Sequence, residues 1–243
     1  MILELDCGNS LIKWRVIDAS GARMLAGVAS EPAILYEGLA DTRITKGRLV
    51  SVRSESETET LVHELEELLG IDIQTARPQL QLGVVRNGYD DYARLGLDRW
   101  LAVVAGFDLA KGACLILDLG TAVTADFVSA QGEHLGGFIC PGIELMRGQL
   151  QKHTRRIRYQ VEELSITDIT RPGRNTVDAV ERGCLLMLQS FAQGQVRLAH
   201  ELLGDAVTVL ITGGDAALVS DTVPNAVLAD DLVFRGLGLA CPL

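Results

Sequence analysis

The sequence contains one short pattern twice, and this repeat limits the folds open to the chain more than any other feature. An apolar segment, Ile2–Asp6, ends in an Asp and leads into Cys7-Gly8-Asn9-Ser10. A second apolar segment, Ala113–Asp118, ends in the same way and leads into Leu119-Gly120-Thr121-Ala122. The two Asp residues are 112 positions apart in a chain of 243 residues, close to half its length. We therefore predict an internal duplication, with one buried strand and one glycine turn in each of two similar lobes.

The segments around the two turns alternate between strand and helix patterns. Residues 11–17 and 123–128 alternate like strands that return from the turns. Apolar residues at helical spacing predict an amphipathic helix over 57–69 that ends at Gly70, and a long helix over 176–200. Further predicted elements are a strand over 48–54, a helix from Asp98 to about residue 111, a strand over 207–211 and a short helix from Ala216. This order predicts an α/β protein with lobes at 1–112 and 113–243.

The charge of the chain argues against a nucleic-acid-binding protein. It has 22 Lys and Arg against 32 Asp and Glu, a formal charge of −10 with His neutral. Affinity for a phosphate backbone comes from clustered Lys and Arg, so an anion bound by this chain must be held at a local site. One basic cluster follows Pro141-Gly142, and we assign it to a dimer face or a site rim. Its members are Arg147, Lys152, His153, Arg155, Arg156 and Arg158.

The number of cysteines and the pattern of apolar residues predict the cellular location of the protein. Five cysteines, an odd number with no Cys-x-x-Cys pair, indicate reduced thiols in a cytoplasmic protein. The N-terminus lacks the basic start and apolar run of a signal peptide, and no apolar stretch is long enough for a membrane span. None of the four histidines has a partner at metal-ligand spacing, so we assign none to chemistry. We expect neither nucleic acid nor membrane as a partner.

Each glycine turn can bind a phosphate through its backbone. Without a Cβ, Gly8 and Gly120 let an anion approach the main-chain N–H groups. An Asp at the strand end cannot contact a phosphate directly, so its natural role is to hold a cation or a metal-bound water. A third turn, over residues 212–215, joins a strand to a helix through two glycines. The alternative, a plain β-hairpin with a capping Asp, explains one such turn more easily than two in register.

Other phosphate and catalytic motifs are absent from the sequence. It has no G-x-x-x-x-G-K-[ST] loop, and Gly236-x-Gly238 lacks the third glycine of a dinucleotide fingerprint. It also lacks H-E-x-x-H and G-x-S-x-G. Zinc hydrolysis and acyl transfer from a serine elbow therefore lose their main support.

Four motifs together resemble a known family. Residues 6–13 (DCGNSLIK), 96–99 (GLDR), 118–126 (DLGTAVTAD) and 175–183 (NTVDAVERG) look like the type III pantothenate kinases of the actin-like ATPase superfamily. The resemblance extends from residue 2 to about residue 240, with Ser10 where many members have Thr. It implies two similar ribonuclease H-like lobes, with mixed sheets flanked by helices, in a homodimer. It also implies ATP-dependent phosphorylation of pantothenate to 4′-phosphopantothenate, the first step of coenzyme A biosynthesis.

The resemblance implies a nucleotide site around the first two turns. The implied nucleotide loop comprises Asp6, Cys7, Gly8, Asn9, Ser10, Leu11, Ile12 and Lys13. Asp6 is implied to hold hydrated Mg2+ on ATP, and Asp118 to bind an activating monovalent cation, K+ or NH4+. Thr121 matches a residue that contacts ATP. Lys13 adds a positive charge near the phosphates, unless it is an ordinary exposed strand lysine.

The resemblance also implies a pantothenate site around Gly96-Leu97-Asp98-Arg99. Asp98 matches the general base that takes the proton of the primary hydroxyl, and the Arg99 guanidinium suits the pantothenate carboxylate. Tyr89 matches an aromatic residue of the pocket, and Thr176 a contact from the neighbouring subunit. From the residues alone, Asp98 could cap a helix, Tyr89 could be a surface residue and Thr176 could begin a helix.

Two other functions stay open from the residues. Another actin-like kinase, acting on a sugar or a small acid, would keep both phosphate turns without needing Gly96-Leu97-Asp98-Arg99 and Thr176 together. A nucleotide-binding regulator without catalysis would have no use for a positioned base such as Asp98.

Overall fold

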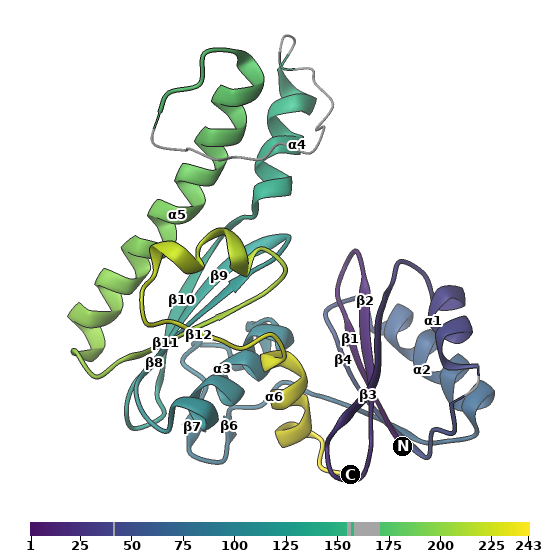
Figure 1. Ribbon diagram of the computed structural model, residues 1–243. Coiled ribbons are helices and arrows are strands. Elements are labelled where there is room, and N and C mark those ends of the chain that lie inside the picture. Colours follow the sequence, from purple (N-terminus) through teal and green to yellow (C-terminus); the bar gives the residue numbers. More distant parts are fainter. Residues whose placement is uncertain (41, 155–156, 158–170) are drawn as a thin grey trace. The chain divides into compact units, whose positions relative to one another are not determined.

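The computed structural model describes residues 1–40, 42–154, 157 and 171–243, and the chain divides into two compact units. The first unit consists of residues 1–109 and 231–243, and the second of residues 110–230 (Figure 1). The last helix of the chain therefore belongs to the first unit. The predicted lobe boundaries, 1–112 and 113–243, follow the duplicated halves of the sequence. As a division into domains they stay a prediction.

A five-stranded mixed sheet forms the first unit, with the strand order β3-β2-β1-β4-β5. β1 is antiparallel to β2 and parallel to β4, while β3 is antiparallel to β2 and β5 is parallel to β4. The strands are β1 (Ile2–Cys7), β2 (Ile12–Ile17), β3 (Arg23–Ala29), β4 (Lys46–Ser51) and β5 (Ile73–Thr75). β4 ends before the predicted end at residue 54, because Ser54 already caps the next helix.

The second unit repeats this sheet. Its strand order is β10-β9-β8-β11-β12, and β8 is antiparallel to β9 and parallel to β11, as β1 is to β2 and β4. The strands are β8 (Cys114–Leu119), β9 (Ala122–Val128), β10 (His134–Pro141), β11 (Thr208–Thr212) and β12 (Val227–Leu228). The predicted α/β fold, with two similar lobes built on mixed sheets, is confirmed.

Two helices, α1 (Pro32–Leu39) and α2 (Glu55–Leu69), cover one face of the first sheet (Figure 1). The Ser54 side chain accepts a hydrogen bond from the N–H of Glu57, whose carboxylate in turn accepts one from the N–H of Ser54. This capping box starts α2 two residues before the predicted Glu57. The helix ends, as predicted, at Gly70, which has a left-handed backbone with φ of 64°.

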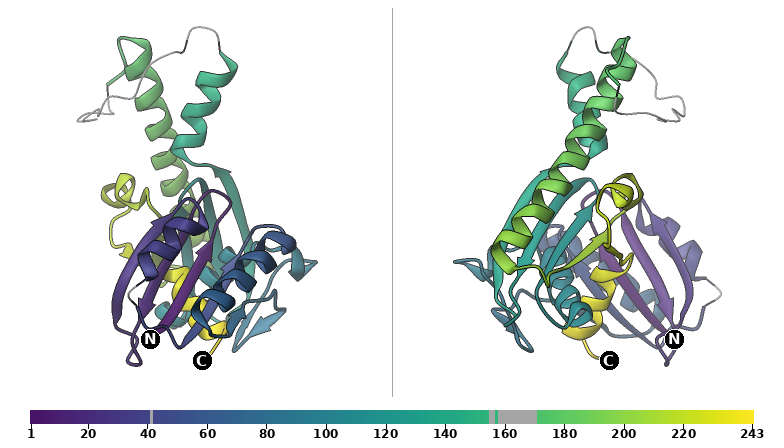
Figure 2. Two further views of the ribbon diagram at one scale, coloured as in Figure 1. Left: turned by 90° about the vertical axis from the view of Figure 1, so that its right-hand side faces the viewer. Right: turned by 60° about the vertical axis from the view of Figure 1, so that its left-hand side comes forward.

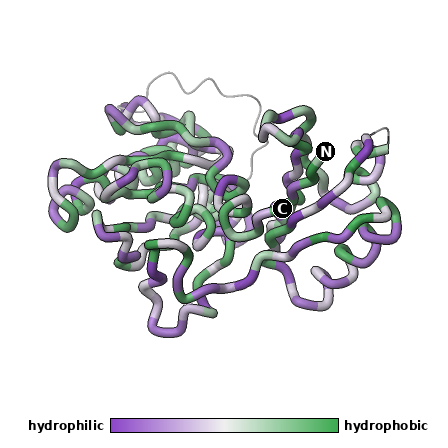
Figure 3. Tube along the Cα trace, turned by 90° about the horizontal axis from the view of Figure 1, so that it is seen from below, coloured by the Kyte–Doolittle hydropathy of each residue, from purple (hydrophilic) through white to green (hydrophobic). Residues whose placement is uncertain are grey.

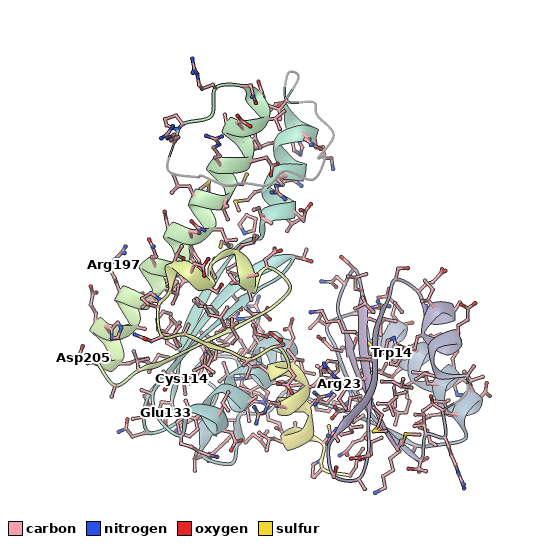
Figure 4. All side chains as sticks on the ribbon, in the orientation of Figure 1. Trp14, Arg23, Cys114, Glu133, Arg197 and Asp205 are labelled. Carbon is pink, nitrogen blue, oxygen red and sulfur yellow. The ribbon has the colours of Figure 1, made fainter. Side chains whose placement is uncertain are left out.

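Trp14 of β2 shows how closely α1 packs on this face. The indole, labelled in Figure 4, is 8% exposed and points toward α1. A Cβ added to Gly38 of α1 would lie 2.7 Å from the Trp14 ring, and one added to Gly27 of β3 would lie 2.6 Å from it. Glycine at both positions leaves the room that the indole fills.

Two further helices of the first unit, α3 (Leu97–Ala110) and α6 (Leu232–Ala240), pack together through backbone contact. A Cβ on Gly236 of α6 would lie 2.1 Å from the carbonyl oxygen of Leu101 in α3, so no larger residue fits there. α6 also contacts β1 and β4, on the side of the sheet opposite α1 and α2 (Figure 1). The first sheet is thus covered on both faces.

In the second unit, α4 (Ile143–His153) and α5 (Thr176–Leu203) lie side by side and extend beyond the second sheet (Figures 1 and 2). α5 begins at the predicted residue but continues past the predicted end at His200, to Leu203, and Gly204 forms its C-cap. The short helix predicted from Ala216 is a single 3-10 turn, η2. The remaining elements are β6 (Gln81–Leu82), β7 (Val85–Arg86), η1 (Tyr92–Arg94), η2 (Ala216–Leu218) and η3 (Ser220–Thr222).

Hydrophobic and hydrophilic residues are interspersed along the trace of both units (Figure 3). In the part of the chain that the structure describes, no helix is long and apolar enough to cross a membrane. All five cysteines are free thiols, and four of them are buried.

Candidate active site

The first glycine turn connects β1 to β2 and carries the predicted nucleotide loop. The N–H of Gly8 donates a hydrogen bond of 3.0 Å to the carbonyl of Leu11, and Cys7 pairs with Ile12 where the strands meet the turn. The predicted glycine turn between the two strands is therefore present. The side chains of Cys7 and Ile12 are fully buried in the core, so these two residues can face a ligand only through their backbone.

Charged and polar side chains surround this turn. Asp6 and Lys13 are direct neighbours across β1 and β2, Asp6 half-buried and Lys13 exposed. Asn9 and Ser10 are exposed in the turn itself. A carboxylate, an ammonium group and a glycine turn thus lie together at one end of the first sheet.

Arg53 is a residue of the first turn that sequence reasoning missed. Its Nε donates a hydrogen bond of 2.9 Å to the carbonyl of Gly8, and the N–H of Val52 donates one of 3.1 Å to the carbonyl of Cys7. The parallel pairing of β1 with β4 places Cys7 beside Ser51, so the residues after β4 reach the turn. Arg53 could have been found from the sequence, because it lies at the end of the strand predicted over 48–54. Neighbouring parallel strands end at the same edge of a sheet.

The second and third glycine turns lie against each other at the carboxyl ends of β8 and β11. Asp118 is paired with Thr212, and the N–H of Asp215 donates a hydrogen bond of 2.9 Å to the carbonyl of Leu119. Gly213 has φ of +94°, and a Cβ there would lie 2.6 Å from Oδ1 of Asp118. Only glycine combines this backbone with such a close approach to the carboxylate.

Gly142 also contacts the second turn and was not singled out from the sequence. Its N–H donates a hydrogen bond of 2.9 Å to the carbonyl of Thr121, and a Cβ on it would lie 2.0 Å from the carbonyl oxygen of Gly120. Gly142 immediately precedes α4, so the start of this helix is held against the turn. The Thr121 side chain stays exposed there.

Asp98 lies in the first turn of α3, inside the helix rather than before it. It is half-buried, and its Oδ1 accepts a hydrogen bond of 2.8 Å from the N–H of Arg99. A Cβ on Gly96 would lie 2.9 Å from the same oxygen. Because α3 begins at Leu97, Asp98 does not occupy the N-cap position that the capping alternative requires. Leu97 itself is buried, so its contribution is to packing.

Tyr89 and Arg99 form one cluster with Asp98. The Arg99 guanidinium donates a hydrogen bond of 2.7 Å to the Tyr89 hydroxyl and lies 5.6 Å from the centre of its ring. The side chain of Asn87 accepts a hydrogen bond from the N–H of Tyr89 and donates to the carbonyl of Tyr92, which holds the loop in place. The structure thus unites the predicted substrate residues of the first unit.

Thr176 is the exposed first residue of α5. The cap of this helix is Asn175, whose side-chain oxygen accepts a hydrogen bond of 2.8 Å from the N–H of Asp178. Capping is therefore assigned to Asn175, and the hydroxyl of Thr176 does not serve that purpose. Thr176 belongs to the second unit, whereas Tyr89, Asp98 and Arg99 belong to the first.

The third turn carries a carboxyl group with a perturbed pKa. Burial raises the pKa of Asp215 above its ordinary value, and the nearby Glu144 adds to the rise, whereas Arg147 opposes it. Arg147 donates a hydrogen bond of 2.8 Å to Glu144 and pairs with the buried Glu181 of α5. In the predicted basic cluster, Lys152 and His153 form the last turn of α4, and Arg155, Arg156 and Arg158 lie outside the described residues.

The second sheet contains a buried polar pair that the sequence did not indicate. Nε2 of His134 lies 2.9 Å from Oδ1 of Asp126, and each residue is 2% exposed. The pair joins the neighbouring strands β9 and β10. His134 has no place in the proposed chemistry.

The residues at the turns suit the cations that the resemblance implies. Mg2+ usually keeps several waters and binds through one or two carboxylates together with substrate phosphates, and Asp6 supplies one carboxylate at the first turn. At the second turn, the space beside the Asp118 carboxylate is kept free of a Cβ by Gly213. Oxygen donors of this kind suit hard cations. Among the described residues, no group of three or more His, Cys, Asp or Glu is placed to hold a metal ion by itself.

The matching family model and the similar curated proteins point to the same family. A model of the type III pantothenate kinase family matches residues 2–198. A type III pantothenate kinase from Pseudomonas fluorescens strain Pf0-1 is 57% identical over 249 residues, and the match covers 100% of both chains.

Two solved structures have the same fold at lower identity. A protein from Campylobacter jejuni, described as a Baf family transcriptional activator, is 21% identical with a TM-score of 0.65, over 97% of this chain and 94% of that chain. A protein from Sinorhizobium meliloti, described as a 2-dehydro-3-deoxygalactonokinase, is 15% identical with a TM-score of 0.54, over 100% of both chains. At these identities the likeness concerns the fold alone, and it agrees with the α/β fold of two similar lobes.

Proposed function

This chain belongs to the type III pantothenate kinase family, and on that basis we propose a role for each part of its candidate site. The protein is a kinase that phosphorylates pantothenate in coenzyme A biosynthesis, with ATP as the phosphoryl donor. The proposal concerns how named residues carry out this reaction.

Asp98 is the proposed general base. It takes the proton of the primary hydroxyl of pantothenate while the hydroxyl oxygen bonds to the γ-phosphorus of ATP and the bond to the β-phosphate oxygen breaks. ADP and 4′-phosphopantothenate result. In a loose transition state the proton leaves late, so the position of Asp98 matters more than its basicity. The hydrogen bond that its carboxylate accepts from the N–H of Arg99 limits the movement of the carboxylate and supports this role.

Pantothenate carries a carboxylate, and Arg99 is the proposed partner for it. The Arg99 side chain is 7% exposed and is held by Tyr89, so its guanidinium loses little freedom when a carboxylate binds. The grouping of Asp98, Arg99 and Tyr89 is the single observation that carries the proposed mechanism, because it combines a base with an anion-binding group.

The first turn is the proposed site of the ATP phosphates. The N–H groups of Asn9 and Ser10 face the phosphate oxygens, whereas the N–H of Gly8 is already bonded to the carbonyl of Leu11. Lys13 and the Arg53 guanidinium offset the negative charge of the phosphates. Mg2+, held through water by Asp6, supplies charge neutralisation on the phosphates when bound.

The second turn is the proposed site of the activating cation. Asp118 holds K+ or NH4+ in the space left by Gly213, and Thr121 contacts the nucleotide. In a protein of net charge −10, a bound cation reduces the repulsion between carboxylates and a triphosphate.

We further propose a homodimer in which Thr176 completes the pantothenate site of the partner. α5, which Thr176 begins, exposes Leu186 and Met187 with 53% and 64% of their surface accessible. Exposed apolar surface of this kind is compatible with a protein–protein interface and supports the proposal. A cytoplasmic location fits the five free thiols.

One assay tests the proposal: ADP release from ATP in potassium buffer, with and without pantothenate, on protein whose oligomeric state is measured by gel filtration. Pantothenate-dependent release by a dimer is the expected result. Release with a sugar instead would favour another actin-like kinase, and no release with any acceptor would favour a regulator. An active monomer would contradict the role of Thr176.

A further inference from the structure

A buried row of charges crosses the first sheet beneath α6. Glu4 of β1 lies directly between Arg15 of β2 and Arg48 of β4, with which it is in register. Glu4 is fully buried, and both guanidinium groups pair with its carboxylate. Nε of Arg48 donates a hydrogen bond of 2.7 Å to Oε1 of Glu4.

The two arginines hold opposite ends of α6. Arg15 donates a hydrogen bond of 3.0 Å to Asp231, just before the helix, and lies 4.7 Å above the ring of Phe234. Arg48 donates to the carbonyl of Gly238 at 3.3 Å and to that of Cys241 at 3.0 Å, at the end of the helix. A guanidinium there satisfies carbonyls that the helix leaves unpaired.

The middle of α6 packs directly against α3, so a shift of α6 would also move α3. Gly236 packs on the backbone of Leu101 so closely that a Cβ would lie 2.1 Å from its carbonyl oxygen. Leu101 is three residues after Asp98, so the contact falls one helical turn from the proposed base. Glu4 and Asp6 are two residues apart on β1, so they point to the same face of the sheet.

Stability alone does not explain this arrangement. Buried ion pairs rarely stabilise a protein more than well-packed apolar residues of similar size, but their directional bonds select one geometry. The row has one buried carboxylate, two guanidinium groups and Asp231, so its formal charge is balanced.

We propose that Glu4 is a positioning residue of the kinase: through Arg15 and Arg48 it sets α6, and through α6 it sets the turn of α3 that carries Asp98, relative to Asp6 on β1. Glu4 itself touches no substrate. The inference rests on the proposed role of Asp98 as the base.

The test compares Glu4→Gln with a variant that disturbs the opposite face of the same sheet. Leu65→Ala removes a fully buried side chain of α2 and lowers stability without touching α3 or α6. For Glu4→Gln we expect kcat to fall about ten- to a hundred-fold with KM for both substrates changed less than about two-fold, since misplaced groups lose transition-state stabilisation. Leu65→Ala should keep its kcat at a temperature where it is fully folded. Amide hydrogen exchange should become faster in α6 and the first turns of α3 in Glu4→Gln only.

A second variant keeps the test decisive if Glu4→Gln does not fold. Arg48→Lys retains the charge opposite Glu4, but an ammonium group cannot bind the carboxylate and two carbonyls as the planar guanidinium does. Folded Glu4→Gln or Arg48→Lys protein with wild-type kcat, or with unchanged exchange in α3 and α6, would overturn the proposal. Asp98→Asn distinguishes failure of the positioning role of Glu4 from failure of the general-base role of Asp98. An active Asp98→Asn enzyme would refute the general-base role. An inactive Asp98→Asn enzyme together with a fully active Glu4→Gln enzyme would refute the positioning role alone.

Discussion

The Arg99 guanidinium donates a hydrogen bond of 2.7 Å to the Tyr89 hydroxyl, which links the loop after β7 to the first turn of α3. Arg99 is 7% exposed, so this bond lies in surroundings poor in competing water. Tyr89 and Arg99, which the family resemblance implies as separate contacts of pantothenate, are therefore directly bonded to each other. A change in Tyr89 should act on substrate binding through Arg99.

Replacing Tyr89 with Phe tests this link. The variant removes the acceptor for Arg99 but keeps the ring, so we expect KM for pantothenate to rise about ten-fold with a smaller change in kcat, because a hydrogen bond to a charged group is lost. Steady-state kinetics with pantothenate varied at saturating ATP measures both constants. Tyr92→Phe, at the exposed tyrosine of η1, is the matched control and should behave as wild type. An unchanged KM in Tyr89→Phe would remove Tyr89 from the pantothenate site.

Asp98→Asn should lower kcat by about two to four orders of magnitude, the usual contribution of a general base, with a smaller effect on KM. The amide has nearly the same shape as the carboxylate but cannot accept the hydroxyl proton. Glu59→Gln, at an exposed position of α2, controls for the loss of one negative charge. A kcat that stays at the wild-type level would leave Asp98 with a structural role only.

Gly213→Ala should destabilise the second unit by more than about 2 kcal/mol, because a positive φ is costly for alanine and the new Cβ would meet backbone. The nearest atoms would be the carbonyl of Leu119 at 2.4 Å and Oδ1 of Asp118 at 2.6 Å. Gly214→Ala is the matched control, since nothing lies within 4 Å of a Cβ there. Urea unfolding of both variants gives the free energies. Equal stability of the two would show that the third turn adapts and does not confine Asp118.

Exchange of potassium for sodium tests the cation assigned to Asp118. We expect the rate of phosphoryl transfer to fall in sodium buffer at constant ionic strength, because the proposal assigns K+ or NH4+ to Asp118 as the activating cation. In Asp118→Asn the difference between the two buffers should disappear. A wild-type rate that is the same in both buffers would contradict the cation site.

Cysteine alkylation tests the buried environment of the first turn. Burial raises the pKa of the Cys7 thiol to about 12, so at pH 8 only about one molecule in ten thousand carries the reactive thiolate. Iodoacetamide should therefore leave Cys7 unmodified in the native protein, while the half-buried Cys140 reacts sooner. Peptide mass spectrometry reports each site, and all five thiols should react in urea. Rapid modification of native Cys7 would mean that the turn opens readily.

The sequence by itself determined the local structure of this protein. The ends of the first strand of each lobe could be predicted to within one residue, since β1 ends at Cys7 and β8 at Leu119. The glycine turns after them and the start of α5 could also be predicted, because backbone sterics and periodic burial act between residues close in the chain. The duplication was visible for the same reason, since equal local patterns form equal local structures. Helix and strand ends were less certain, as the capping box at Ser54 shows.

Only the tertiary structure decided which distant residues meet. Arg53 reaches Gly8, and Glu4 lies between Arg15 and Arg48, through strand registers that no local pattern specifies. The close approach of Gly213 to Asp118 likewise depends on the pairing of β11 with β8. The return of α6 to the first unit, across more than a hundred intervening residues, is of the same kind. Such contacts arise from the packing of whole sheets and helices, in which each position depends on all the others.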